Sequence, residues 1–205
     1  MLRRHSSPAD ASRFVVVGLG NPGKQYANTL HNVGQMTVEL LAGRWSAHLK
    51  AGKDRALVAE TRVSGTPTVL AVPTTFMNES GSAVSSLVRR FRLDDMSHLV
   101  IVHDELDLEP GTVRIKSGGG LAGHNGLRSI NQHLKSADFV RVRIGVGKPR
   151  SKEQGADHVL TPMTGRADSG TASTAPERPR TSCRPGSLRA SAARSASPLA
   201  TVTGR

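Results

Sequence analysis

The fold is decided by one stretch near the start of the chain, Arg13-Phe-Val-Val-Val-Gly-Leu-Gly-Asn-Pro-Gly-Lys-Gln-Tyr-Ala-Asn-Thr-Leu-His-Asn-Val-Gly34. The apolar run at 14–17 predicts a buried strand, which a glycine turn at 18–23 follows. A helix is then predicted to begin near Thr29. Such a strand carries the residues after it to the carboxyl edge of a sheet, where open α/β sheets bind ligands. We therefore expect a site that contains Asn21, Tyr26, His31 and Asn32.

Residues 18–23 also match the dinucleotide-binding pattern G-x-G-x-x-G. In that kind of site the helix opens directly on the glycines. Here the 3.6-residue apolar period starts only at Val33. The acidic residue that should follow about twenty positions later has only Glu39 as a candidate, and Glu39 lies inside the predicted helix. We therefore expect no bound cofactor.

The rest of the chain alternates between predicted strands and helices. Extended segments are expected at 56–63, 68–72, 99–102, 112–116 and 139–146, and helices from Ser80 or Ser82 onward and at 125–134. The first two of these strands are joined by a short turn at 64–67, which predicts a hairpin and hence a mixed sheet. The pattern predicts an α/β fold, a single-domain sandwich in which a twisted mixed β-sheet is flanked by helices on both faces.

The composition limits the class of protein. The 205 residues carry a formal net charge of +12, and only 3% are aromatic, which favours a nucleic-acid partner held through its phosphates. The single cysteine, Cys183, excludes an intramolecular disulfide and a thiolate metal cluster. Because no run of about eighteen apolar residues occurs, we expect no membrane span and a cytoplasmic protein.

Two segments are expected to lie outside the folded domain. Residues 1–12 form a polar extension, and residues 163–205 are rich in Ser, Thr, Ala, Arg and Pro without a hydrophobic period. Segments of this kind bury too little surface to offset their conformational entropy, so both are predicted to be disordered. The folded domain is expected at 13–162. A shifted reading frame near codon 163 is our hypothesis for the composition of the tail, and resequencing the gene tests it.

Four ordered motifs carry a family resemblance. The stretch quoted above is followed by Thr75-Phe-Met-Asn-Glu-Ser-Gly81, Val102-His-Asp-Glu-Leu-Asp-Leu108 and Gly118-Gly-Gly-Leu-Ala-Gly-His-Asn-Gly-Leu127. Together they resemble bacterial peptidyl-tRNA hydrolases, which cut the ester between a peptide and its tRNA. The resemblance covers about 13–162 and implies a metal-independent esterase that recycles tRNA released prematurely from ribosomes. It also implies helices on both faces of the sheet, and we expect a monomer.

Two residues fit the chemistry of ester hydrolysis, which needs a proton acceptor for water and donors for the oxyanion. His31 is expected in the first turn of a helix, where the dipole disfavours imidazolium and keeps the base free. Asp104 ends an apolar strand and can accept a hydrogen bond from the other nitrogen of His31. The resemblance likewise implies that His31 is the catalytic base and that Asp104 orients it.

Further site residues follow from the resemblance alone. Asn21 matches a residue beside the catalytic histidine that helps the family prefer blocked aminoacyl esters to free ones. Asn78 and Asn125 match amides that hold the substrate's peptide and a water. Tyr26 and Phe76 match residues that line the same cleft.

The resemblance also assigns the tRNA contacts. It places the glycine loop at 118–126 against the tRNA end of the cleft. Arg114, Lys116 and Arg143 match basic residues that grip phosphate, so binding is expected to weaken as salt rises. The chain departs from the family at Leu30, where Arg is usual, at Val72, where Lys is usual, and after residue 162, where no closing helix is legible.

Two other functions stay open at this point. A metal-dependent hydrolase would use His31, His103, Asp104 and His124, but their dispersion along the chain and the lack of an H-E-x-x-H spacing argue against it. A non-catalytic RNA-binding protein of the same fold is the other alternative, and the intact His31 and Asp104 speak against that.

Overall fold

The computed structural model describes residues 13–149, 151 and 154–163, so the expectations for 1–12 and for nearly all of 163–205 lie outside it. The described strands are β1 (Phe14–Gly18), β2 (Lys50–Ala51), β3 (Ala56–Val63), β4 (Thr66–Pro73), β5 (Leu99–Glu105), β6 (Val113–Ser117) and β7 (Val140–Gly145). The α-helices are α1 (Val33–Arg44), α2 (Ser80–Phe91), α3 (Asn125–Leu134) and α4 (Gly155–Val159). Three 3-10 turns are η1 (Leu30–Asn32), η2 (Met77–Glu79) and η3 (Met96–His98).

The strands form one mixed sheet in the order β2-β3-β4-β1-β5-β7-β6, which confirms the predicted fold class. β1 pairs in parallel with β4 and β5, and β5 pairs in parallel with β7. β2, β3 and β6 run antiparallel to their neighbours. The carboxyl ends of β1, β4, β5 and β7 therefore meet at the same edge of the sheet, where α/β folds place their ligands.

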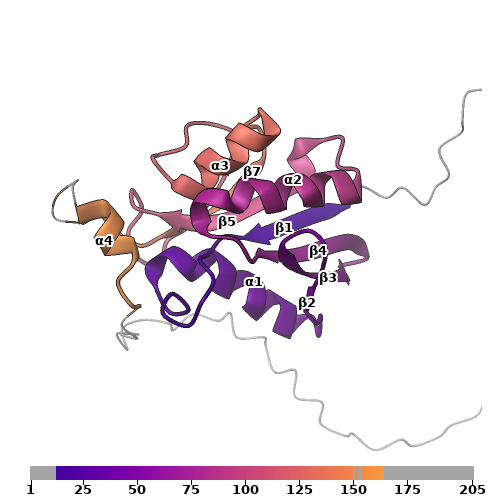
Figure 1. The fold of residues 1–205 in the computed structure, drawn as a ribbon, viewed down its shortest axis with the longest axis horizontal. Helices are drawn as coiled ribbons and strands as arrows, with labels where there is room; N and C mark the ends of the chain where they lie inside the picture. Colours follow the sequence, from indigo (N-terminus) through magenta and orange to yellow (C-terminus); the bar gives the residue numbers. More distant parts are fainter. Residues whose placement is uncertain (1–12, 150, 152–153, 164–205) are drawn as a thin grey trace, which may run out of the picture. The chain divides into compact units, whose positions relative to one another are not determined.

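Helices cover both faces of the sheet (Figure 1). α2 and α3 lie over one face, where their apolar side chains join a core that includes Val17, Leu87 and Ile130. α1 lies over the other face and buries Val38 against Leu70 and Val102. None of the helices in the described part of the chain has the length and apolarity needed to span a bilayer.

Two glycines let α1 begin directly against the sheet. A Cβ on Gly18, at the end of β1, would collide with the carbonyl of Gly34. A Cβ on Gly34 would in turn collide with the carbonyl of Val102 in β5. The turn η1 that precedes α1 is consequently held at the carboxyl ends of the central strands.

Several local predictions were wrong. The hairpin turn consists only of Ser64 and Gly65, whose φ angles of 49° and 83° suit a tight turn, so β4 already begins at Thr66. Neither serine caps α2, because Ser80 is its first residue and donates its hydroxyl to the Met77 carbonyl instead. The sequence pattern did not predict β2 or α4, which have two and five residues and are too short to show a period.

Candidate active site

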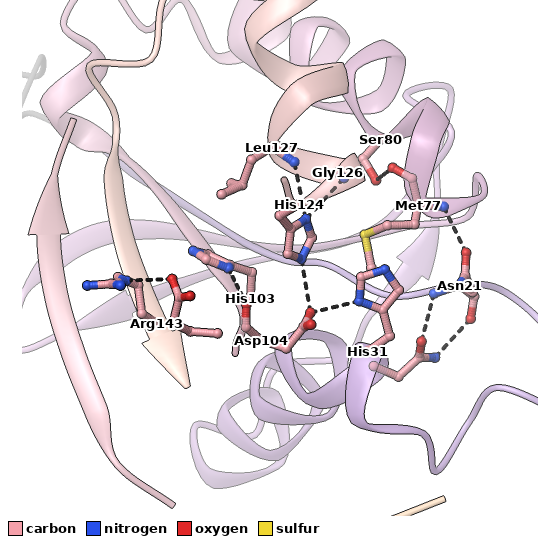
Figure 2. Close-up of polar contacts among 12 residues, drawn as sticks. Asn21, His31, Met77, Ser80, His103, Asp104, His124, Gly126, Leu127 and Arg143 are labelled. Carbon is pink, nitrogen blue, oxygen red and sulfur yellow. Dashed lines mark hydrogen bonds and ion pairs between the residues drawn. The ribbon is translucent and has the colours of Figure 1, made fainter. Parts of the chain in front are cut away.

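The site lies at the carboxyl edge of the sheet, where segments from distant parts of the chain meet. The loop after β1 supplies Asn21 and His31, and the loop after β4 supplies Met77 and Asn78. Asp104 is the second-last residue of β5, and the glycine loop leads into α3 through His124. Figure 2 shows the side chains of Asn21, His31, Met77, Asp104 and His124 converging. The polar residues therefore gather at the carboxyl edge of the sheet, where the sequence predicted the site.

His31 lies in the turn η1 and not in an α-helix, which begins only at Val33. Thr29 occupies the cap position but makes no capping hydrogen bond with its side chain. The predicted helix start near Thr29 was therefore slightly early. The ring of His31 is buried, and its Nδ1 lies 2.9 Å from Oδ1 of Asp104. The contact predicted between these two residues is present, while their catalytic roles stay predictions.

The hydrogen-bond partners assign a tautomer to each of two histidines. His124 accepts at Nδ1 from the backbone N–H groups of Gly126 and Leu127 at 3.1 and 3.4 Å, so the proton of its neutral ring is on Nε2. That Nε2–H donates to Oδ1 of Asp104 at 2.9 Å. Because an ionised carboxylate only accepts, His31 also donates to Oδ1, from Nδ1. One carboxylate oxygen therefore receives two imidazole N–H groups.

This arrangement leaves Nε2 of His31 with a free lone pair. In Figure 2 that nitrogen is turned toward the side of the ring on which Met77 and Asn21 lie. Burial alone would raise the pKa of Asp104, but His124 and His31 outweigh burial and hold that pKa below its usual value. Asp104 thus stays ionised and fixes His31 with its basic nitrogen toward the cleft.

His103 neighbours this group without belonging to it. Its Nδ1–H donates to the backbone carbonyl of Asp104 at 2.6 Å, and its ring lies 5.0 Å from that of His124. Burial and the proximity of His124 lower the pKa of His103 to about 3. His103 is therefore neutral at working pH, and it lines the same cavity as Asp104 and His124.

A metal centre is the alternative to which this cluster must be compared. The four proposed ligands are far apart along the chain, but three of them meet in the fold. Potential ligand atoms of His31, Asp104 and His124 lie within 4.8 Å of one another, so the distance along the sequence was a wrong reason to reject a metal site. A metal at Nε2 of His124 would, however, move the ring proton to Nδ1, where two backbone N–H groups already donate. The tautomers therefore favour a hydrogen-bonded group of side chains over a metal site.

The amide side of the cleft is built around Asn21. Its Oδ1 accepts from the backbone N–H of Met77 at 2.8 Å, which leaves the Nδ2 donors without a partner in the described part of the chain. Asn32 holds the Asn21 backbone, accepting from its N–H at 2.8 Å and donating to its carbonyl at 2.9 Å. A cavity of about 410 Å³ is lined here by Asn21, His31, Met77, Asn78 and Asn125. Three amide side chains thus face the space beside His31.

A second cavity, of about 330 Å³, is also lined by His31. Asp104, His124 and Asn125 line it, and α4 contributes Val159. His31 and Asn125 line both cavities, as do Ala156 and Val159 of α4.

The segment after α4 is tied to the loop that carries His31. The backbone N–H of Leu30 donates to the Thr161 carbonyl at 3.1 Å, and that of Met163 donates to the Asn28 carbonyl at 2.7 Å. Both bonds involve residues just before His31 in the sequence. They fix the loop against the end of the described chain.

The remaining predicted site residues are absent from the lining of both cavities. Phe76 is 52% exposed and Tyr26 is half-buried, and neither lines the two cavities. Arg114 and Lys116 are exposed on the edge strand β6. Arg143 pairs with Arg114 across the sheet, but its Nε donates to Glu105 at 2.8 Å. A carboxylate therefore partly neutralises the charge of Arg143.

The sequence did not predict how three residues build the site. His124 was considered only as a ligand of the alternative metal site, and no signal along the chain indicates that it donates a hydrogen bond to Asp104. The clamp by Asn32 depends on the path of a loop. Arg141 is buried beneath the glycine loop, although the alternation of arginines in β7 is typical of an exposed strand face.

Comparisons with known proteins agree with this geometry. The sequence model of the family described as Peptidyl-tRNA hydrolase matches residues 15–177. A peptidyl-tRNA hydrolase of Rhodococcus opacus is 49% identical over 154 residues, which are 73% of this chain and 79% of the relative. One from Frankia alni is 51% identical over 153 residues, 75% of this chain and 77% of the relative. The crystal structure of the peptidyl-tRNA hydrolase from Acinetobacter baumannii superposes with a TM-score of 0.71 at 41% identity, covering 75% of this chain and 78% of that one. The chain belongs to the peptidyl-tRNA hydrolase family.

Proposed function

We propose that this chain hydrolyses the ester between a peptide and the 3′-terminal ribose of tRNA, as a cytoplasmic monomer that recycles tRNA released from ribosomes. Family membership supports the reaction class. The observation that carries the mechanism is the contact of 2.9 Å between Nδ1 of His31 and Oδ1 of Asp104, beside two cavities. It supplies a base that is oriented before substrate binds.

In the first step, a water attacks the ester carbonyl carbon, and its proton passes to Nε2 of His31. The imidazolium that forms is stabilised by the carboxylate of Asp104, which does not itself take the proton. His124 helps to keep that carboxylate ionised, because its Nε2–H donates to the same oxygen at 2.9 Å. The step needs no charge on the enzyme before reaction other than that of Asp104.

The amides stabilise the charge that develops on the ester oxygen. Asn21 presents Nδ2 donors because its own oxygen is held by the Met77 N–H, and Asn78 and Asn125 line the same cavity. Hydrogen bonds aimed at a developing oxyanion are among the larger contributions to catalysis. The tetrahedral intermediate then collapses, the bond from carbonyl carbon to ribose oxygen breaks, and His31 returns its proton to that oxygen. The products are a peptide acid and tRNA with a free hydroxyl.

The basic residues of β6 and β7 hold the RNA in this proposal. Arg114 and Lys116 are exposed and supply phosphate contacts, and the outer nitrogens of Arg143 add a weaker one beside Glu105. Contacts of this kind give affinity without sequence choice.

The test is release of a labelled N-acetylated amino acid from its tRNA by the wild type and by His31→Ala, with the unblocked aminoacyl-tRNA as control. We expect rapid cleavage of the blocked ester only, and a loss of about 10² to 10⁴ in kcat for the variant. Wild-type protein that is folded by circular dichroism but cleaves neither ester would favour the non-catalytic RNA-binding alternative.

A chelator separates this mechanism from the metal-dependent alternative. Activity that survives prolonged dialysis against a strong chelator is expected, since each nitrogen that faces Asp104 carries a proton in the hydrogen-bonded arrangement. Loss of activity that is restored by a single divalent metal would reject the proposed role of the His31–Asp104–His124 group.

A further inference from the structure

A buried arginine lies beneath the glycine loop and makes its bonds to backbone carbonyls. Arg141, in β7, is 2% exposed. Its Nη1 donates to the Gly120 carbonyl at 2.6 Å, and its Nη2 donates to those of Gly119 and Ala137 at 2.8 and 3.2 Å. The guanidinium also lies 5.0 Å from the ring centre of Phe139. No acidic side chain in the described part of the chain forms an ion pair with it, so the loop itself is its main partner.

The loop depends on this arginine for its conformation. Gly118 and Gly119 have φ angles of 61° and 95°, in the region that glycine adopts readily and other residues rarely do. Among the described residues, the bonds from Arg141 are the only hydrogen bonds that Gly119 and Gly120 make. A run of three glycines has high conformational entropy, so an unbonded loop here would sample many conformations.

The far end of the same loop carries groups of the site. The backbone N–H of His124 bonds to the Leu121 carbonyl at 2.9 Å, and the next residues open α3. The His124 side chain donates to Asp104, and Asn125 lines both cavities beside His31. A displacement of Gly119 or Gly120 would therefore also displace His124, which lies only a few residues further along the loop and donates to Asp104.

We propose that Arg141 is a positioning residue for the hydrolase reaction, which holds the glycine loop so that His124 and Asn125 stay in register with Asp104 and His31. The inference rests on the proposed function. Arg141 touches neither cavity, and its effect passes through the loop. Its planar fork bonds several carbonyls at fixed angles, whereas a lysine would place one point charge at the same spot.

The kinetic consequence is a loss of turnover with little loss of binding. RNA affinity is supplied by phosphate contacts on the exposed strand β6, which Arg141 does not make. Misplacement by about 1 Å of groups near the reacting atoms can cost about a hundredfold in rate. Removing Arg141 should therefore lower kcat and leave KM for the blocked aminoacyl-tRNA almost unchanged.

The experiment compares Arg141→Met, Arg141→Lys and the control Arg90→Met by steady-state kinetics, thermal unfolding and proton NMR of the His124 Nε2–H that is bonded to Asp104. Arg90 makes a comparable hydrogen bond of 2.6 Å to buried Asp54, remote from both cavities. For Arg141→Met we expect kcat to fall about tenfold or more, KM to stay within about threefold, and the His124 signal to broaden or vanish. Arg141→Lys should lie between the wild type and Arg141→Met. Arg90→Met should lower the melting temperature but keep kcat and the signal.

Three results would overturn the inference. The first is unchanged kcat in folded Arg141→Met, and the second is a raised KM at constant kcat, which would make Arg141 an RNA-binding group. The third is full activity in Arg141→Lys, which would show that Arg141 contributes only a positive charge. This variant also tests the inference if Arg141→Met does not fold. The NMR signal tests the loop without any substrate. If the proposed function is wrong, the wild type will cleave no ester, but the NMR signal of the His124 Nε2–H will still differ between the wild type and Arg141→Met.

Discussion

Two aspartates of this protein are equally buried and equally well bonded, yet only one belongs to the site. Asp54 is 4% exposed and Asp104 is 3% exposed. Asp54 accepts from Ser86 at 2.8 Å and from Arg90 at 2.6 Å. Asp104 accepts two bonds of 2.9 Å from histidine side chains. In both, burial alone would raise the pKa of the carboxyl, and the hydrogen-bonded partners outweigh it and lower that pKa.

The difference lies in what the partners can do. The guanidinium of Arg90 keeps its protons at any working pH, so the pair with Asp54 ties the turn before β3 to α2 and can do no proton chemistry. The partners of Asp104 are imidazoles, which can gain or lose a proton, and the second nitrogen of His31 faces a cleft. A buried carboxylate is thus not enough to mark an active site. A titratable partner beside a cavity is the further requirement.

The strongest test of this contrast is Asp104→Asn. An amide can set its N–H group against Nδ1 of His31 and turn the ring to the wrong tautomer, as well as removing the charge that stabilises imidazolium. We expect kcat to fall about a thousandfold while the melting temperature changes by only a few degrees. Steady-state cleavage of N-acetylated aminoacyl-tRNA measures this. A fall of less than about tenfold would mean that Asp104 is no more catalytic than Asp54.

The next effect concerns His124, which both caps α3 and donates to Asp104. His124→Ala loses both interactions, whereas His124→Ser keeps an acceptor at the cap. We expect kcat to fall about tenfold or more in each variant, and His124→Ser to regain about 1 kcal/mol of unfolding free energy relative to His124→Ala. Kinetics and urea unfolding of both variants separate the two roles. Recovery of kcat in His124→Ser would show that the donor to Asp104 is unimportant.

The same substitution at Asp54 should lower stability and leave activity unchanged, which is the opposite of the result expected for Asp104→Asn. Asp54→Asn weakens the hydrogen bond from Arg90 and removes the ion pair, at a site where Arg90 is itself partly exposed. We expect a loss of about 2 kcal/mol in the free energy of unfolding with kcat unchanged within about twofold. Urea unfolding and steady-state kinetics measure the two quantities. A loss of activity without loss of stability would contradict the contrast.

The smallest effect is the pH dependence of that stability. The hydrogen bonds to Asp54 lower its pKa below the ordinary value of 3.8, so the folded state favours the ionised form. The stabilisation is therefore fully present above about pH 5 and is lost as the pH falls through the lowered pKa. The difference in unfolding free energy between the wild type and Asp54→Asn should stay constant from about pH 7 to 5 and shrink below about pH 4. A difference that grows in acid would have the wrong sign.

Sequence alone predicted the sheet and the meeting of His31 with Asp104, and physical reasons explain both. Apolar runs mark buried strands, and parallel strands bring their carboxyl ends to one edge, so residues 73 positions apart are expected together. Asp54, in contrast, ends no apolar strand.

What the sequence did not predict depends on side-chain directions within loops. His124 reaches Asp104 because its Nδ1 is used to cap α3, which turns Nε2 toward β5. Arg143 and Arg141 alternate along one strand, but one binds Glu105 and the other is buried under the loop. Sequence periodicity cannot distinguish the environments of these two arginines. Each environment depends on which carbonyl or carboxylate lies next to the side chain in the folded protein.

The most direct test of the central claim is the tautomeric state of His31 and His124, read from the nitrogen-15 shifts of the imidazole rings at neutral pH. The account predicts a proton on Nδ1 and a bare Nε2 in His31, with the reverse in His124. A proton on Nε2 of neutral His31 would contradict it, because the nitrogen that faces the cleft could then take no proton from water.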